Sequence, residues 1–178
     1  MAEEVIEILD LDGVNRAITR IAHEILEKNA GVNNLLLVGI RTGGAHLATQ
    51  LQQKINEIEG TTVSLGIIDV TMYRDDLGSR NNLEIGQTCI RVPVTGQKVV
   101  LVDDVLYTGR TIRAALDAVI ALGRPQNIQL AILVDRGHRE LPIRPDYIGR
   151  NIPTAQNEQI EVNFDDNNVP QGVHLLRN

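Results

Sequence analysis

The chain contains short runs in which no residue is polar, and these runs constrain the fold more than any other feature of the sequence. Leu35 to Ile40 and Val99 to Val102 are the clearest examples. A strand with one face in water alternates apolar and polar residues, whereas an unbroken apolar run is typical of a strand covered on both faces. We therefore predict buried strands at these two positions. Further strands are expected over 63–72, 89–94, 128–134 and 160–164.

Segments with helical spacing separate these strands. The first has Asp12 as its predicted N-cap and Gly31 as its predicted end, and helices are also expected over 45–58 and 111–122. Buried strands that alternate with helices favour an α/β fold, with a mostly parallel central sheet flanked by helices. We expect residues 1–178 to form a single domain.

The composition argues against several classes of protein. One Phe, three Tyr and no Trp give little material for stacking single-stranded nucleic acid, and a net charge of −6 argues against binding nucleic acid through the overall field. A local basic face is still allowed. Cys89 is the only cysteine, so an internal disulfide is excluded. No apolar run approaches the roughly 20 residues of a membrane helix, and the start of the chain lacks the basic residues of a signal peptide. We expect a cytoplasmic protein with no membrane partner.

The most informative segment runs from Val99 to Thr111. A buried strand ends at Asp103 and Asp104, a short loop follows, and a helix begins near Thr111. Ligands of open parallel sheets bind beyond the C-terminal ends of the strands. The two carboxylates at this edge have the right chemistry to accept hydrogen bonds from sugar hydroxyls.

The loop itself has the residues that an anion needs. The start of a helix offers unpaired backbone N–H groups and the positive end of the helix dipole. Gly109 allows the backbone to curl closely around a phosphate, and Thr108, Arg110 and Thr111 add donors or charge. The segment therefore predicts a site for a phosphorylated sugar.

The segment does not fit the common nucleotide-binding motifs. It lacks the G-x-x-x-x-G-K pattern of a Walker loop, and no G-x-G-x-x-G follows any strand. The simplest alternative is that Asp103 and Asp104 only end a strand and that Thr108 and Gly109 form a turn. A more distant one is Mg²⁺-dependent phosphoryl chemistry at the acid pair, which would leave the Thr-Gly-Arg-Thr sequence without a role.

Two further segments attract attention. Arg41-Thr42-Gly43-Gly44 also lies between a predicted strand and a predicted helix, so it is a second anion-binding turn by the same physics. Residues 73–87 are charged and contain two Gly, which predicts a long mobile loop, and loops of that length usually have a function.

Residues 99–111 resemble the 5-phosphoribosyl-1-pyrophosphate motif of type I phosphoribosyltransferases: four apolar residues, two acids and a phosphate loop that ends T-G-x-T. Residues 19–23, 69–76 and 135–154 are similar to one branch of that family, the bifunctional pyrimidine operon regulators that are also uracil phosphoribosyltransferases. The resemblance extends over nearly the whole chain. It implies the type I phosphoribosyltransferase fold, with a long flexible loop and a small hood.

The resemblance also implies a reaction and a set of roles. Uracil and 5-phosphoribosyl-1-pyrophosphate would give UMP and pyrophosphate, with Mg²⁺ carried by the pyrophosphate donor and no protein ligand assigned to the metal. Asp103 and Asp104 would hold the ribose hydroxyls and stabilise positive charge on the ring, while Arg74 on the closing loop would meet the pyrophosphate. The implied substrate contacts are Arg41, Thr42 and Gly43 for pyrophosphate, Val105, Leu106, Tyr107, Thr108, Gly109, Arg110 and Thr111 for the 5-phosphate, and Arg136 and Ile160 for uracil.

The chain departs from this family at Gly43. Relatives typically carry Arg at that position, and its loss removes a charge-assisted donor to a phosphate. We therefore expect weaker catalysis, unless Arg41 compensates, without a loss of ligand binding.

The same branch binds pyr messenger RNA when loaded with UMP, and so favours transcription termination. Thr19 and His23 are four residues apart and share one face of the first helix. Exposed Arg and His on a helix are usually only solvated, so this prediction depends on the resemblance. The implied RNA-binding residues are Thr19, Arg20, His23, Lys28, His138, Arg144 and Arg150.

A homodimer or higher homo-oligomer could collect these residues on one concave surface. Two narrower alternatives stay open. The protein could be an attenuator that senses UMP or UTP with little transferase activity, or a salvage enzyme without RNA regulation.

Overall fold

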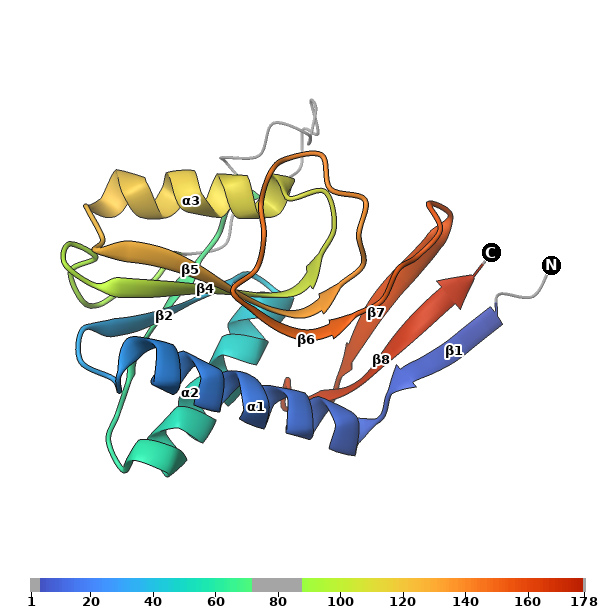
Figure 1. The fold of residues 1–178 in the computed structure, drawn as a ribbon, viewed down its shortest axis with the longest axis horizontal. Coiled ribbons are helices and arrows are strands. Elements are labelled where there is room, and N and C mark those ends of the chain that lie inside the picture. Colours follow the sequence, from blue (N-terminus) through green and yellow to red (C-terminus); the bar gives the residue numbers. More distant parts are fainter. Residues whose placement is uncertain (1–3, 72–87, 178) are drawn as a thin grey trace.

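The apolar runs form the centre of a parallel sheet (Figure 1). In the computed structural model, the structure describes residues 4–71 and 88–177. Within these residues the sheet has five strands in the order β3-β2-β4-β5-β6, and every adjacent pair is parallel. Its strands are β2 (Leu35–Ile40), β3 (Ser64–Ile68), β4 (Lys98–Leu106), β5 (Asn127–Asp135) and β6 (Tyr147–Asn151).

Helices cover both faces of this sheet. Figure 1 shows α1 (Leu11–Asn29) and α2 (Gly43–Glu59) on one face and α3 (Arg110–Leu122) on the other. Because successive side chains of a strand point to opposite faces, Leu37 and Val100 join the core under α1 and α2, whereas Leu36 and Leu101 join the core under α3. The predicted mostly parallel sheet, buried on both sides, is confirmed.

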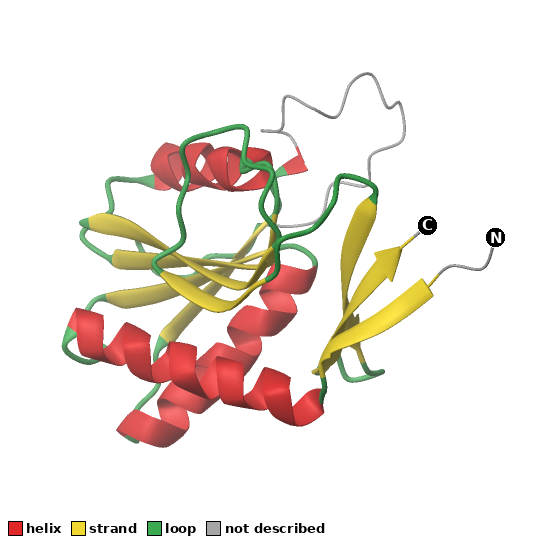
Figure 2. Cartoon of the chain, turned by 45° about the vertical axis from the view of Figure 1, so that its right-hand side comes forward, coloured by secondary structure: helices red, strands yellow, loops and turns green. Residues whose placement is uncertain are grey.

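A smaller antiparallel sheet lies beside the main one, as Figure 2 shows. Its order is β1 (Glu4–Leu9), β8 (Pro170–Arg177), β7 (Glu158–Phe164), so the two ends of the described chain pair with each other. We call this sheet the hood. An edge-to-face contact between the rings of His46 and Phe164, with centroids 5.2 Å apart, joins α2 to the end of β7.

The connections of the main sheet run outward from its centre. The chain passes from β2 through α2 to β3 on one side, and from β4 through α3 to β5 on the other. The topological switch point therefore lies between β2 and β4, at the place where open α/β sheets bind ligands. The C-terminal ends of these two strands lead into Arg41–Gly44 and Asp103–Thr111.

The ends of the first helix differ from the prediction. Asp10, not Asp12, is the N-cap, because its carboxylate accepts a hydrogen bond from the N–H of Gly13 at 2.7 Å. The helix ends at Asn29, and the left-handed residue that closes it is Ala30 rather than Gly31.

The predicted strand over 89–94 is also wrong. Only an isolated bridge joins Cys89 to Ile67, and Pro93 has no N–H with which to extend a ladder. The strand expected over 63–72 ends at Ile68. β1, β6 and β8 were not predicted.

Candidate active site

The acid pair lies at the C-terminal end of β4, and the backbone that follows holds both carboxylates. Asp103 is buried, and its Oδ1 accepts a hydrogen bond from the N–H of Asp104 at 2.9 Å. Oδ1 of Asp104 accepts one from the N–H of Val105 at 2.8 Å. Each side chain is thus oriented by the residue after it.

Gly109 turns the chain from the loop into α3. Its φ of 93° lies in the left-handed region that favours glycine, and α3 begins at the next residue, Arg110. The carbonyl of Gly109 accepts a hydrogen bond from the N–H of Arg113 at 2.9 Å, which starts the helix. The predicted order of strand, loop and helix is observed, with the helix starting one residue earlier than expected.

The carbonyl groups of the loop are held from outside it. The oxygens of Leu106, Tyr107 and Thr108 all accept hydrogen bonds from the segment that follows β5. The donors are, in order, the N–H of Arg136 at 3.1 Å, Nη1 of Arg139 at 2.8 Å, and the N–H groups of Glu140 and Leu141 at 2.9 and 3.2 Å.

The amide groups of the loop show the opposite pattern. In the part of the chain that the structure describes, the N–H groups of Tyr107, Thr108, Gly109 and Thr111 have no hydrogen-bond partner. A cavity of about 280 Å³ opens against the loop and is lined by Asp103 and by all four of these residues. Carbonyls drawn outward and unpaired amides at the start of a helix are what an anion-binding loop requires.

The second predicted anion-binding turn lies directly beside the acid pair. A Cβ at Gly43 would collide with the carboxylate of Asp104, and one at Gly44 would collide with the carbonyl of Val102. The first clash is with the end of a flexible side chain, whereas the second is with backbone, so it is Gly44 that allows α2 to start this close to the end of β4. The N–H of Arg41 donates to the carbonyl of Ile68 at 2.9 Å, and the Arg41–Thr42 peptide bond is cis.

Arg136 is buried next to the loop. Its guanidinium lies over the ring of Tyr107, 4.0 Å from the centroid, and donates to the carbonyl of Glu158 at 2.6 Å and to Oγ1 of Thr154 at 3.2 Å. Arg136 thus connects the phosphate loop with the first residue of β7 in the hood.

An ionic chain crosses the three strands of the hood. Nε of Arg177 donates to Glu158 at 2.8 Å, and its Nη1 donates to Glu4 at 3.0 Å. The hydrogen bond from the N–H of Ala155, together with Arg177, lowers the pKa of Glu158, while the two carboxylates raise the pKa of Arg177. Sequence reasoning missed Glu158 and Arg177 because only the folded chain brings them together.

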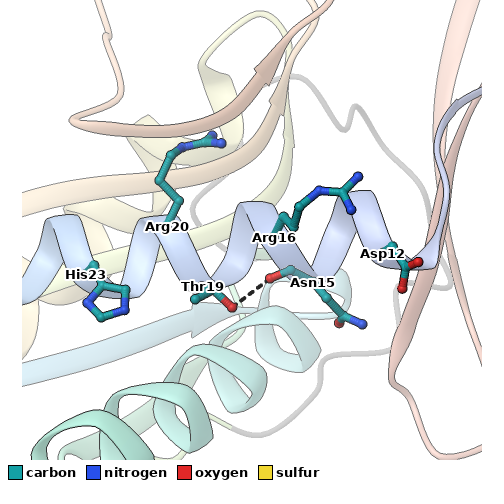
Figure 3. A pocket seen from close by; sticks show the side chains of 6 residues that line it. All are labelled: Asp12, Asn15, Arg16, Thr19, Arg20 and His23. Carbon is teal, nitrogen blue, oxygen red and sulfur yellow. Dashed lines mark hydrogen bonds between the residues drawn. The ribbon is translucent and has the colours of Figure 1, made fainter.

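One residue of the predicted RNA face on α1, Arg20, is held by the edge strand of the main sheet. Figure 3 shows Arg16, Thr19, Arg20 and His23 along the exposed side of α1, where with Asp12 and Asn15 they line an open depression. Nη2 of Arg20 donates to the carbonyls of Ile148 and Gly149 in β6, at 2.9 and 2.7 Å.

The other predicted RNA residues fall into two places. Lys28 forms an ion pair of 2.8 Å with Asp146, just before β6, and Arg144 and Arg150 are exposed on the same stretch of chain. The structure thus brings this stretch together with α1. His138 lies elsewhere: its ring contacts that of Tyr107, with centroids 5.8 Å apart, and its Nε2 lies 2.6 Å from the carbonyl of Thr154.

One predicted catalytic residue and one predicted loop fall outside the part of the chain that the structure describes. Arg74 and the loop 73–87 lie outside the described residues. Across residues 4–71 and 88–177, no three His, Cys, Asp or Glu side chains gather in a way that could hold a metal ion. Two neighbouring carboxylates suit a Mg²⁺ ion that arrives on a phosphorylated ligand and keeps several waters.

None of the described helices is both long enough and apolar enough to span a membrane.

The fold and the site together define a class. A parallel sheet with paired acids, a phosphate loop and a second anion-binding turn at its switch point is the arrangement of a type I phosphoribosyltransferase. The family described as phosphoribosyl transferase domain matches residues 4–167. Among solved structures, hypoxanthine phosphoribosyltransferases share this fold. The one from Staphylococcus aureus superposes with a TM-score of 0.67 at 20% identity, covering 87% of this chain and 80% of that one. The one from Trypanosoma cruzi gives 0.68 at 24% identity, covering 84% and 79%.

Curated relatives narrow the assignment. The bifunctional protein PyrR of Geobacter sp. strain M21 is 59% identical over 99% of this chain and 100% of its own length. The bifunctional protein PyrR of Bacillus subtilis is 56% identical, covering 89% of this chain and 90% of its own. The chain belongs to the PyrR family of phosphoribosyltransferases.

Proposed function

We propose that this protein transfers the phosphoribosyl group of 5-phosphoribosyl-1-pyrophosphate to uracil, giving UMP and pyrophosphate. The observation that carries the proposal is the contrast between the carbonyl and the amide groups of the loop after β4. Its carbonyls are occupied by donors from outside, and the amides of Tyr107, Thr108, Gly109 and Thr111 are left for a ligand. Such a loop selects a dianion, and a 5-phosphate fits both its charge and its size.

The acid pair then acts on the ribose. With the 5-phosphate bound at the start of α3, the diol of the sugar lies toward the end of β4, where Asp103 and Asp104 accept hydrogen bonds from its hydroxyls. As the bond from C1 to pyrophosphate breaks, the ring gains positive charge. Two carboxylates held in place by their own backbone stabilise that charge without having to reorganise.

Uracil is proposed to bind between Arg136 and the free edge of β7. Arg136 donates to the carbonyl of Glu158, so the backbone of Glu158 faces away from β8. Along a strand, the direction in which the backbone N–H and C=O groups point repeats every two residues, so those of Ile160 also point away from β8. The N–H and C=O of Ile160 can therefore pair with the edge of a pyrimidine, whose N1 attacks C1 of the ribose.

Pyrophosphate is assigned to the turn Arg41–Gly44, which lies beside Asp104. Mg²⁺ is proposed to arrive on the donor and to neutralise charge on the departing pyrophosphate. Arg74, which lies outside the described residues, is proposed to contact the same pyrophosphate group. The role of the chain is to hold the donor between two anion-binding turns.

The test is UMP formation from labelled uracil, 5-phosphoribosyl-1-pyrophosphate and Mg²⁺. Asp104→Asn should lower kcat by at least about 100-fold, as loss of one preorganised electrostatic group typically does. Asp117→Asn, which changes an exposed acid on α3, is the matched control and should leave kcat unchanged. Failure to form UMP, with orotate or a purine used instead, would refute the assignment.

We also propose that the protein binds pyr messenger RNA in a UMP-dependent way. The supporting observation is that α1 and β6 lie side by side, because Arg20 and Lys28 contact the stretch that carries Arg144 and Arg150. Thr19 and His23 lie along the exposed side of the same helix. Because the net charge of the chain is −6, contact with the RNA phosphates has to be limited to this face. Lys28 and His138 belong to the same proposal, although His138 lies at the phosphate loop and would act from the nucleotide side.

Three broader expectations complete the proposal. Residues 1–178 form one domain, which acts as a homodimer or higher homo-oligomer. Exposed apolar side chains, such as Ile120 at 59% and Leu122 at 52% of their full exposure, are available for self-association. A cytoplasmic location follows from substrates and an RNA that are themselves cytoplasmic.

A further inference from the structure

The phosphate loop is supported from behind by one short stretch of chain. Residues 135–143, which we call the buttress, start at the last residue of β5 and donate to the carbonyls of Leu106, Tyr107 and Thr108. Most of these donors are backbone N–H groups, which only a substitution to proline removes. The hydrogen bond to Tyr107 is different, because its donor is the side chain of Arg139.

Arg139 is held by three partners at once. Its Nη1 donates to the carbonyl of Tyr107 at 2.8 Å, its Nε to the carbonyl of Ile143 at 2.9 Å, and its Nη2 to the carboxylate of Asp135 at 2.7 Å. A planar guanidinium can make these three bonds in different directions, whereas a lysine ammonium on its flexible stem lacks that fixed geometry. With 24% of its side chain exposed, Arg139 is also largely desolvated, so its position is well defined.

The stem of Arg139 packs against the tightest point of the loop. A Cβ built on Gly109 would lie 3.5 Å from Cδ of Arg139 and 3.4 Å from Cδ1 of Ile143. The outer side of Gly109 is therefore filled by the buttress, and the loop cannot relax in that direction.

From these contacts we infer that Arg139 is a positioning residue for the 5-phosphate, which rests on the proposed function. Tyr107 can direct its carbonyl either toward the ligand or away from it. Arg139 fixes it away, and the following N–H, that of Thr108, consequently faces the anion. The positive charge of Arg139 is paired with Asp135 and does not itself contact the ligand. Arg139 thus preorganises the loop and leaves phosphate binding to the backbone.

The experiment compares ligands that do and do not use this loop. Ribose 5-phosphate and UMP should bind Arg139→Ala more weakly than wild type by about 10- to 100-fold, as expected when one hydrogen bond to a charged ligand is lost. Pyrophosphate with Mg²⁺, which uses the turn Arg41–Gly44, should bind both proteins equally in isothermal titration calorimetry. A protein that had merely lost stability would lose affinity for all three ligands.

Two further variants complete the test. Arg139→Lys keeps the charge but not the planar donor set, and it should show most of the loss seen in Arg139→Ala. Arg124→Ala removes an exposed arginine beyond the far end of α3 and should bind every ligand as wild type does. Full rescue by Arg139→Lys, or equal weakening of pyrophosphate and ribose 5-phosphate, would overturn the positioning role. If wild type binds ribose 5-phosphate but forms no UMP, the transferase assignment fails and the role of Arg139 in phosphate binding stands.

Discussion

At the scale of single residues, the contact between Gly43 and Asp104 is the most informative. Any side chain at position 43 would start inside the space that the Asp104 carboxylate now occupies. That carboxylate is the far end of a flexible side chain, so it can move without disturbing the backbone. The turn proposed for pyrophosphate and the acid pair proposed for the ribose therefore adjoin at one small volume, and the residue at 43 determines how much of it Asp104 can occupy.

Replacing Gly43 should change the affinity for the donor. Gly43→Arg displaces Asp104 but adds a guanidinium at the pyrophosphate turn. A hydrogen bond to a charged group contributes about 1.5–3 kcal/mol, so KM for 5-phosphoribosyl-1-pyrophosphate should fall by about tenfold or more. Steady-state kinetics of UMP formation at a fixed uracil concentration measures this KM.

Gly43→Ala is the control for this comparison. It forces the same displacement of Asp104 without supplying the charge, and it should give no gain in affinity. Equal kinetics for the two variants would show that the guanidinium contributes nothing at this position.

At the scale of elements, the ionic chain from Glu4 through Arg177 to Glu158 joins all three strands of the hood. The same residue, Glu158, provides the backbone carbonyl that holds Arg136 beside Tyr107. The pairing of β7 with β8 is therefore connected to the base side of the site through a single residue.

The stability of the hood should depend on the charge of Glu158. Its pKa is lowered in the folded state from an ordinary value of 4.5, chiefly by the hydrogen bond from Ala155 and then by Arg177. A lowered pKa stabilises the folded protein fully above the unfolded pKa, and this contribution is lost as the pH falls through the folded pKa. The melting temperature of wild type should exceed that of Glu158→Gln at neutral pH, and the difference should shrink below pH 4.5.

Thermal unfolding followed by circular dichroism across this pH range provides the measurement. Glu161→Gln, an exposed position on the same strand, should follow wild type throughout. A gap between wild type and Glu158→Gln that stays constant down to acid pH would contradict the role of this charge.

The strands of this fold differed in how well the sequence predicted them. β2, β4 and β5 were found because a strand buried on both faces has to be apolar throughout. β6 was missed because Tyr147–Asn151 is short, contains Gly and lies at an edge, where polar residues are tolerated. β1 and β8 pair across almost the whole length of the chain, so neither has a local pattern that shows its partner.

The same limit applied to the site. The order of acids, glycine and helix start along residues 103–111 was visible in the sequence, because these residues are contiguous. Arg139 donates to a carbonyl 32 residues away, and this contact exists only after β5 is placed beside β4. Of the buttress residues, Arg136 and His138 were given roles in uracil and RNA binding, whereas Arg139 was noticed only as part of the family resemblance.

At the scale of the whole molecule, the two proposed activities occupy different surfaces. The phosphate loop precedes α3, on one face of the sheet, whereas all the proposed RNA residues except His138 lie on α1 and near β6, with α1 on the other face (Figure 1). The activities should therefore be separable by substitution.

Arg144→Ala should weaken binding of pyr leader RNA while UMP synthesis stays near the wild-type rate. For single strands the log–log salt slope of affinity is about −0.7 per phosphate contact, so losing one contact should make the slope less steep by about that amount. Filter binding over a series of salt concentrations, with and without UMP, measures both quantities. Arg113→Ala, on α3, is the matched control. An equal loss of both activities in Arg144→Ala would contradict the separation.

The two hydrogen bonds from Arg20 to β6 have a consequence for solubility. β6 is the outermost strand of the main sheet on its side, and an open rim of backbone groups is a template on which another chain can add a strand. A guanidinium seated on the Ile148 and Gly149 carbonyls obstructs that rim with a charge. We therefore expect Arg20 to disfavour edge-to-edge association at β6.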